Sequence, residues 1–204
     1  MKWEASAPSR IQISNALQML LSRGRDAWGL AIADNCAASD IFVFKHPSCI
    51  GSRKNKKFIY ERLKKASTDG WLMLHSRLST NGYSGHNEHN HPVEYKNITL
   101  IHNGLVVDWP SPVKNLLIDT STDSQNLARM IHSTKESALE NMLNNTTGEI
   151  SIVWNNSSDN TLKLYSNVGG LYIEKQNNQT MVSSEPIKPN GMAIQAKIRK
   201  IVTL

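Results

Sequence analysis

The sequence predicts an α+β protein in which β-sheets are layered with helices. Apolar runs of strand length occur at residues 71–74 and 98–101, and several more follow residue 148. Segments with helical periodicity and helix-capping residues lie between these runs. Because the helices are interleaved with many short strands that cannot all be parallel, sheets covered by helices are the expected architecture.

The first helix is predicted over Ser9–Arg23. Its apolar stripe approximates a 3.6-residue repeat and consists of Ile11, Leu17, Leu20 and Leu21. Ser9 can serve as the N-cap, and Gly24 follows the last turn, as at many helix ends. Further helices are predicted over residues 54–66, 122–132 and 135–143. Thr122 and Gln125 have the spacing of a capping box at the start of the third.

The strands are predicted from apolar runs bounded by turn residues. Residues 28–33 and 40–45 are expected to form a hairpin across the polar residues 34–39. The run at 71–77 is continuously apolar at its start, which is typical of a strand buried on both faces. Other strands are predicted over residues 97–104, 149–154, 161–166, 169–174, 179–185 and 193–204.

Length and composition indicate one domain spanning residues 1–204, with no membrane span. The hydrophobic fraction is 39%, and no apolar run approaches 18 residues. The N-terminus lacks the apolar core of a secretory signal, so a cytoplasmic location is expected. In that compartment Cys36 and Cys49 are expected to be free thiols.

Much of the net charge of +6 lies in the basic stretch Ser52–Lys65. Such a stretch could contact phosphates or an acidic partner. The simpler interpretation is a solvated helix face with Phe58, Ile59 and Leu63 turned inward. No nucleic-acid-binding motif accompanies the charge, so nucleic acid is not expected as a partner.

The histidine-rich stretch His75–Pro92 admits three interpretations. Zinc could bind to His86, His89 and His91, with His75 and His102 as possible additions, but this spacing matches no common zinc motif. The stretch could instead be a polar surface turn. Its third interpretation is an anion-binding and catalytic loop; no metal or cofactor is predicted in that case.

The anion-binding interpretation rests on residues at the ends of two apolar strands. Arg77 ends one strand, where a guanidinium can bind a carboxylate through two parallel hydrogen bonds. Thr80 and Asn81 add neutral donors. Asn103 and Gly104 end the other strand, and an amide with a glycine N–H can form an oxyanion hole. Taken alone, this Asn-Gly pair is more often a type I′ turn.

Taken together, several blocks resemble the glutaminase domain of class II glutamine amidotransferases, which are N-terminal-nucleophile hydrolases. In chain order they are RGRDAWGLAI, LHSRLSTNG, NHP, LIHNGLV, STDSQNLARMI and MVSSE, spanning residues 23–185. The resemblance extends over almost the whole chain, from about Ser9 to Glu185. It implies a four-layer αββα sandwich of two mainly antiparallel sheets.

The resemblance also implies roles for individual residues. Arg77, helped by Thr80, would bind the α-carboxylate of glutamine, and Asp123 would pair with its α-ammonium group. Asp123 can equally be a helix N-terminal acid. Asn103 and Gly104 would form the oxyanion hole. Arg23, Asp26 and His91 would have supporting roles, although Arg23 could be only a helix-terminal cation; Asn81 stands where the family usually has histidine.

The family's nucleophile is a cysteine at the mature N-terminus, whose own α-amine can act as the base. The printed chain begins MKWEASAP, and neither Cys36 nor Cys49 occupies the matching place. Two explanations stay open: a start assigned too late, or a domain that has lost catalysis and now binds a ligand or partner. Retention of the oxyanion-hole residues favours the first.

Two principal function hypotheses follow. The first is a glutaminase that releases ammonia to a separate synthase. The second is a catalytically inactive amidotransferase-like binding or scaffold module. A zinc hydrolase and a nucleic-acid-binding protein are weaker alternatives.

Overall fold

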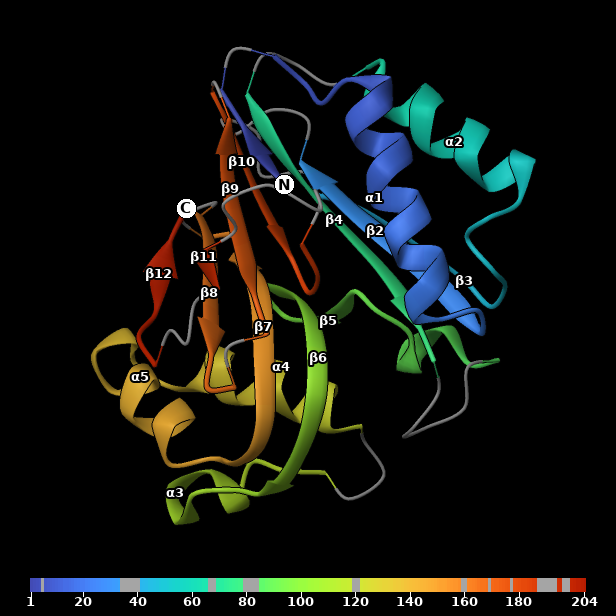
Figure 1. The fold of residues 1–204 in the computed structure, drawn as a ribbon. Coiled ribbons are helices and arrows are strands. Elements are labelled where there is room, and N and C mark those ends of the chain that lie inside the picture. The colour runs from blue at the N-terminus through green and yellow to red at the C-terminus, as the bar shows by residue number, and fades with distance from the viewer. Residues whose placement is uncertain are drawn as a thin grey trace.

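The computed structural model describes residues 1–4, 6–33, 41–65, 69–78, 85–118, 122–158, 161–168, 170–176, 178–186, 194–195 and 199–204. These residues form two antiparallel sheets that pack against each other, with helices on their outer faces (Figure 1). The α+β fold with four αββα layers, expected from the sequence and the resemblance, is confirmed.

The first sheet has seven strands in the order β11-β9-β10-β1-β4-β2-β3. Its strands are β1 (Lys2–Trp3), β2 (Ala27–Ala33), β3 (Phe42–His46), β4 (Gly70–Arg77), β9 (Tyr172–Gln176), β10 (Gln179–Ser183) and β11 (Ile194–Gln195). The predicted hairpin is the β2–β3 pair, in which Leu30 lies opposite Phe44. Strand β1 lies between β4 and β10 and pairs with both.

The second sheet has five strands in the order β12-β8-β7-β6-β5. Its strands are β5 (Val93–Tyr95), β6 (Ile98–Asp108), β7 (Thr147–Asn156), β8 (Thr161–Ser166) and β12 (Val202–Thr203). The predicted last strand, residues 193–204, is therefore wrong as one element, because β11 and β12 belong to different sheets.

Helices cover the outer face of each sheet. Helices α1 (Arg10–Arg23) and α2 (Arg53–Leu63) pack on the first sheet, while α4 (Asp123–Ser133) and α5 (Glu136–Asn144) pack on the second (Figure 1). A short helix α3 (Ser111–Lys114) follows β6. The predicted capping box is present at Thr122–Gln125. Ser9 is the N-cap of α1 as predicted, and it also forms a capping box with Gln12, which was not predicted. Each box satisfies helix N-terminal N–H groups that have no partner within the helix.

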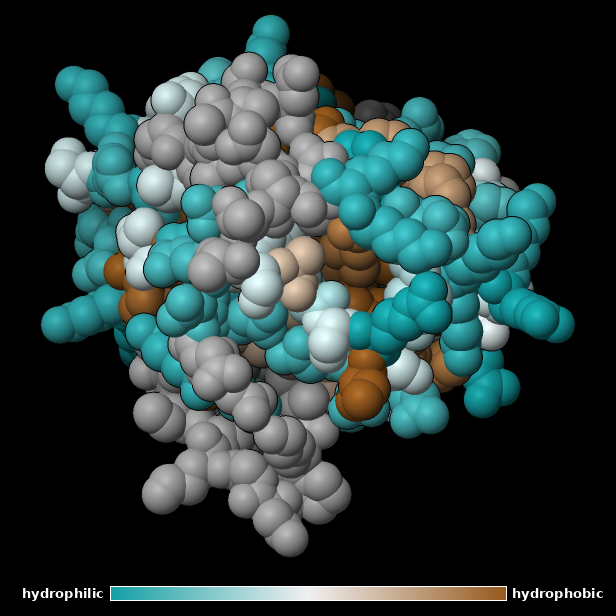
Figure 2. All heavy atoms as spheres, turned by 90° about the horizontal axis from the view of Figure 1, so that it is seen from above, coloured by the Kyte–Doolittle hydropathy of each residue, from teal (hydrophilic) through white to brown (hydrophobic). Residues whose placement is uncertain are grey.

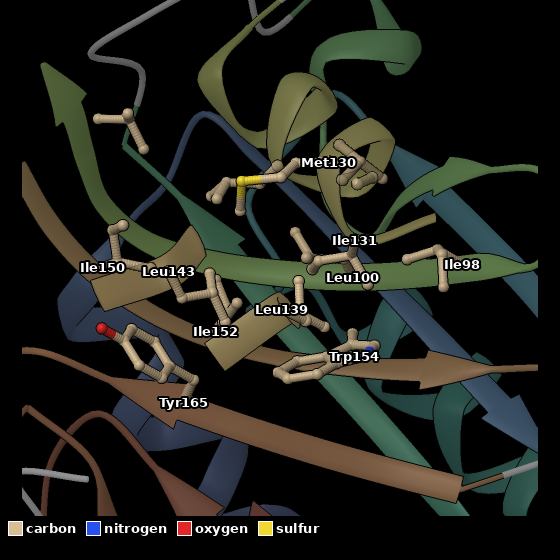
Figure 3. Packing of buried hydrophobic residues seen from close by; sticks show 14 of the residues in the cluster. Ile98, Leu100, Met130, Ile131, Leu139, Leu143, Ile150, Ile152, Trp154 and Tyr165 are labelled. Atoms are coloured by element: carbon tan, nitrogen blue, oxygen red, sulfur yellow. The ribbon is translucent and has the colours of Figure 1, made fainter. Parts of the chain in front are cut away.

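Three apolar cores hold the four layers together. One lies between α1, α2 and the first sheet, and a second lies between the two sheets, where Trp71 and Met73 are packed with Val153 and Leu164. The third lies between the second sheet and helices α4 and α5; Figure 3 shows side chains from both helices packed over β6, β7 and β8. Burial of these side chains is the main favourable contribution to folding.

The predicted stripe of the first helix is wrong at one position. Ile11 is 73% exposed, while Ile13, Ala16 and Leu17 are buried. Positions 11 and 13 differ by about 200° around a helix, so only one of them can face the sheet. The buried face is the i, i+3, i+4 set that begins at Ile13.

The basic stretch forms α2, and its apolar residues face inward as the simpler interpretation predicts. Ile59 and Leu63 are buried, and Phe58 is half-buried among aromatic rings. Hydrophilic side chains dominate the described surface seen from above, with hydrophobic atoms visible mainly in hollows between them (Figure 2). Within the described part of the chain, no helix combines the length and apolar character needed to cross a membrane.

Candidate functional site

A cavity of about 580 Å³ lies between the two sheets. Its wall includes the ends of β4 and β6, the N-terminus of α4, the C-terminal part of α1, and the residues of β10 and just beyond it. This volume falls within the range of small-molecule sites. Arg77, Asn103, Gly104 and Asp123, which the sequence places far apart, all line it.

Arg77 is the last residue of β4 and is 6% exposed. Its Nη1 donates a hydrogen bond of 2.8 Å to Oδ1 of Asn90, which is fully buried. Burial lowers the pKa of the Arg77 guanidinium, while the nearby carboxylates of Asp26 and Asp123 oppose that shift. The guanidinium stays charged at neutral pH and has five N–H donors, of which Asn90 accepts one. It can therefore present fixed positive charge to the cavity.

Asn103 and Gly104 lie within β6, opposite Ser151 and Ile150 of β7. The type I′ turn interpretation is therefore wrong, because the strand continues to Asp108. Gly104 has a φ of +137°, and a Cβ atom built on it would lie 1.9 Å from the carbonyl oxygen of Glu149. Only glycine fits this backbone without strain. Both Asn103 and Gly104 are exposed and line the cavity.

Asp123 begins α4 directly after the N-cap Thr122. Its Oδ1 accepts from the backbone N–H of Ser124 at 2.8 Å, and its Oδ2 accepts from that of Val106 at 3.1 Å. The helix N-terminus and these two donors stabilise the carboxylate. Asp123 is thus a helix N-terminal acid that also lines the cavity.

Three histidines extend the polar lining. The rings of His75 and His91 are 4.2 Å apart, and Nδ1 of His102 lies 3.1 Å from Oγ of Ser124 and 3.8 Å from Oδ2 of Asp123. Burial lowers the pKa of His75 to about 4. Burial also lowers the pKa of His91 and that of His102, where the Asp123 carboxylate opposes the shift. These rings are therefore neutral at pH 7.

The predicted supporting residues are placed around the cavity wall. Arg23, in the last turn of α1, forms an ion pair of 3.0 Å with Glu185, and both residues line the cavity. The backbone N–H of Asp26 donates to the carbonyl oxygen of Arg77 at 3.0 Å. His91 also lines the cavity. Thr80 and Asn81, predicted to contact the substrate, lie outside the described residues.

The structure does not bring together the three histidines considered as zinc ligands. His91 is buried beside His75, whereas His86 and His89 lie on the more exposed turn around η1 (Asn87–His89). Among the described residues, the group whose ligand atoms lie within 4.8 Å of one another is His86, Glu88 and His89.

We call Arg77, His102, Asn103, Gly104 and Asp123 the polar end of the cavity. A different wall is formed by Met73–His75 of β4 and by Val182–Ser184, at the end of β10 and just beyond it. The N–H of Leu72 donates to the carbonyl oxygen of Met1, and the Met1 α-amine donates to that of Leu72, both at 2.7 Å. β1 pairs with Gly70 and Trp71 of β4 and with Gln179 and Thr180 of β10, and residues that follow these pairs on both strands line the space between them. We call this space the strand-edge gap.

Some features of the site were not predicted from the sequence. Asn90, the buried acceptor for Arg77, lies between His89 and His91 in the histidine-rich loop. The sequence feature that could have indicated it is a polar side chain shortly before Pro92 and the strand that follows, because a buried polar group needs a hydrogen-bond partner. Glu185 pairs with a residue 162 positions away, and no local pattern indicates such a partner. The gap is visible only once strand order is known.

Comparisons with known proteins identify the fold. No protein-family model matches the chain, and no curated protein sequence matches it. A solved structure described as glutamine phosphoribosylpyrophosphate amidotransferase from B. subtilis, complexed with ADP and GMP, matches 90% of this chain with 18% identity and a TM-score of 0.63. Another, described as the allosteric regulatory enzyme of purine biosynthesis, also matches 90%, with 20% identity and a TM-score of 0.67.

The match covers 41% and 40% of those two chains, so the present chain spans about two fifths of their length. At these identities the likeness concerns the arrangement of strands and helices. The fold implied by the motif blocks and the fold found by structural comparison thus agree. The chain has the fold of the amidotransferase structure that it matches.

Proposed function

We propose that the chain is a class II glutamine amidotransferase domain that binds glutamine in the cavity between its sheets. The observation that carries this proposal is that four residues of the polar end line one cavity: Arg77, Asn103, Gly104 and Asp123. Glutamine carries an α-carboxylate, an α-ammonium group and a side-chain amide. A guanidinium, a carboxylate and a pair of neutral donors are the matching groups.

In this proposal Arg77 binds the α-carboxylate and Asp123 binds the α-ammonium group. The side chain of Asn103 and the N–H of Gly104 face the amide carbon, where negative charge develops when a nucleophile attacks. Asn103 is on β6 and Asp123 is on α4, two elements tied by the bond from the Val106 N–H to the Asp123 carboxylate. Fixed donors of this kind stabilise an oxyanion without reorganising during the reaction.

Hydrolysis also needs a nucleophile, and none of the described residues lining the cavity is a cysteine. We propose that a cysteine added before Met1 would supply it in the strand-edge gap. Met1 is opposite Leu72, so in an antiparallel extension of β1 the residue three positions before Met1 would be opposite His75. His75 lies on the same face of β4 as Trp71 and Met73, which face the second sheet. That added residue would therefore face the cavity.

The surroundings of the Met1 α-amine would accommodate a residue joined to it. Burial lowers the pKa of this amine to about 5, which means that its charged form is disfavoured there. A peptide N–H at the same place would donate the same bond to Leu72 without carrying a charge. Val182, Ser183 and Ser184 would lie along the other edge of the added strand.

A cysteine so placed would give a balanced reaction. Its α-amine accepts the thiol proton, and the thiolate attacks the amide carbon to form a C–S bond. The C–N bond then breaks, and ammonia leaves with the proton returned by the amine. Water hydrolyses the thioester, giving glutamate and the free thiol. A separate synthase would consume the ammonia.

The proposal is tested with three forms of the protein: the printed chain, the chain extended by Cys-Gly-Val before Met1, and a matched Ala-Gly-Val extension. We expect the cysteine form to release ammonia and glutamate in equal amounts, and the other two to release neither. Calorimetry with glutamine measures binding in all three.

The outcomes separate the two function hypotheses. If all forms bind glutamine and none hydrolyses it, the domain is a binding module and the hydrolase assignment is wrong. If no form binds glutamine, the assignment of the cavity to this amino acid is wrong. Ammonia release by the alanine form would place the nucleophile elsewhere.

A further inference from the structure

The turn that precedes β5 carries three metal-ligating side chains outside the polar end of the cavity. His86, Glu88 and His89 each offer a ligand atom, and these atoms lie within 4.8 Å of one another. Nδ1 of His86 is 3.7 Å from Oε1 of Glu88, and Nε2 of His89 is 3.9 Å from the same oxygen. We propose that this trio binds a divalent transition-metal ion of the zinc class.

The two separations from Glu88 to the histidines are close to those of a bound zinc site. Zinc binds imidazole nitrogen and carboxylate oxygen at about 2.0–2.2 Å, so neighbouring ligand atoms in a tetrahedral site are about 3.4 Å apart. The two measured nitrogen–oxygen separations exceed this value by a few tenths of an ångström. Small side-chain rotations close that difference, because the trio lies on one turn and needs no movement between elements.

The backbone of the turn is anchored on several sides. The carbonyl oxygen of Glu88 accepts from Nε2 of Gln125 at 3.0 Å, which ties the turn to the start of α4. The N–H of His89 donates to His86, and that of Asn90 donates to Asn87. The side chain of Asn90 accepts a hydrogen bond from Arg77. A fixed backbone lowers the conformational entropy lost when the side chains take up an ion.

The ligand types select the class of ion. Two imidazoles and one carboxylate suit zinc, cobalt, nickel or copper, whereas calcium and magnesium prefer oxygen ligands alone. The exposed fractions of the side chains are 59% for His86, 71% for Glu88 and 20% for His89, so solvent can supply the remaining ligands. Three protein ligands with an open position are typical of an accessible zinc site.

The site lies at the edge of the cavity, because His89 also lines the cavity wall. A metal ion held there would have an open coordination position within reach of small molecules entering or leaving. The inference itself depends only on the geometry of the trio and holds whether or not the cavity binds glutamine.

The test uses the tag-free full chain and cobalt(II) as a spectroscopic probe, with zinc added in competition. We expect one cobalt ion per chain, a visible absorption band typical of four or five ligands, and loss of that band when zinc is added. His86→Ala and Glu88→Gln should each weaken binding tenfold or more. His46→Ala, on the exposed end of β3, is the matched control and should bind as the unaltered chain does.

The contrary results are equally clear. If cobalt and zinc do not bind at concentrations up to about 100 times the protein, or if both variants bind as tightly as the control, the trio is only a surface cluster of ion pairs. Circular dichroism of the variants checks that the fold is kept. Glu88→Gln preserves the shape of the side chain and removes its charge, so its result does not depend on packing.

Discussion

The polar end and the strand-edge gap are neighbouring parts of one cavity, yet they are built in different ways. At the polar end, Arg77 of β4, Gly104 of β6 and Asp123 of α4 are held by side-chain or backbone contacts between elements distant in sequence. The gap is bounded by the edges of two strands and by apolar residues such as Met73 and Val182. The proposed recognition groups are thus held in place by contacts within this chain, whereas the proposed chemistry in the gap depends on what pairs with those edges.

This difference separates binding from catalysis. A preorganised set of charges and donors can hold an amino acid without a nucleophile, because each group keeps its position through its own partners. A strand added in the gap would contribute backbone hydrogen bonds on both edges, as in other cases of strand addition. Changes at the polar end are therefore expected to alter stability and affinity together, and changes at the gap to alter turnover alone.

Gly104→Ala is expected to have the largest effect of the changes considered. The added Cβ would lie 1.9 Å from the Glu149 carbonyl oxygen, and the φ of +137° is strained for alanine. We expect the free energy of unfolding to fall by about 4 kcal/mol, measured by urea denaturation, because backbone atoms must move on both β6 and β7.

Gly170→Ala is the matched control at a second glycine near the same sheet. Its added Cβ would meet Oγ of Ser151 at 3.7 Å, an ordinary contact. The free energy of unfolding should change by less than about 0.5 kcal/mol. A loss in Gly104→Ala as small as the one expected for the control would mean that the backbone of β6 tolerates a side chain and that the polar end is not rigid.

Arg77→Ala is expected to weaken glutamine binding by about 100-fold, or about 3 kcal/mol, as measured by calorimetry. The change removes the proposed partner of the α-carboxylate and the donor to Asn90. Arg77→Lys keeps the charge but cannot form the bidentate hydrogen bonds of a guanidinium, so its affinity for glutamine should lie between those of the alanine variant and the unaltered chain. Unchanged affinity in the alanine variant would contradict the proposed role of the polar end.

Acid is expected to lower the free energy of unfolding through His75, which lies where the polar end meets the strand-edge gap. Its pKa is about 4 in the folded protein and about 6.5 when unfolded, so the unfolded state binds more protons between these values. The contribution of His75 to stability is complete above pH 6.5 and is lost as the pH falls toward 4. We expect a loss of about 2 kcal/mol, allowing for solvent screening in the cavity.

Urea denaturation at pH 7.5 and pH 4.5 measures this effect. His75→Asn removes the titrating group and should make stability less dependent on pH over that interval. His46→Asn, at the exposed end of β3, should leave the dependence as it is. The same dependence in the His75 variant would assign the acid sensitivity to other groups, including His91 and His102, whose pKa values are also lowered by burial.

Local sequence patterns predicted much of the fold, because helix capping and strand burial depend largely on residues that are close in sequence. Ser9 and Thr122 were predicted as helix caps from their own neighbours, and both capping boxes are present. Residues 71–77 were predicted as a buried strand from continuous apolarity, and β4 spans Gly70–Arg77. Where several faces of a helix carry apolar residues, as at Ile11 and Ile13, only packing against the sheet decides which is buried.

The candidate site could be predicted only in part, since its geometry depends on long-range contacts. The motif resemblance named Arg77, Asn103, Gly104 and Asp123, and the structure places all four around one cavity. The Asn103–Gly104 pair taken alone predicted a type I′ turn, but β6 continues through it and pairs with β7 there. The order of β4, β1 and β10 has no signature in local sequence, so the gap between strand edges could not have been located.

Asn90→Asp is expected to have the smallest effect on glutamine affinity. Together with Asn90→Leu, it separates an effect on binding from an effect on stability. Asn90→Asp places a carboxylate 2.8 Å from the Arg77 guanidinium, where it competes with a ligand carboxylate for the same charge. We expect glutamine affinity to fall about tenfold, or about 1.4 kcal/mol, with little change in the free energy of unfolding. Asn90→Leu removes the acceptor from a fully buried position and should instead lower stability by about 1–3 kcal/mol. If the aspartate variant loses stability but keeps its affinity, Asn90 only supports the loop, and Arg77 would not be the group that meets the ligand.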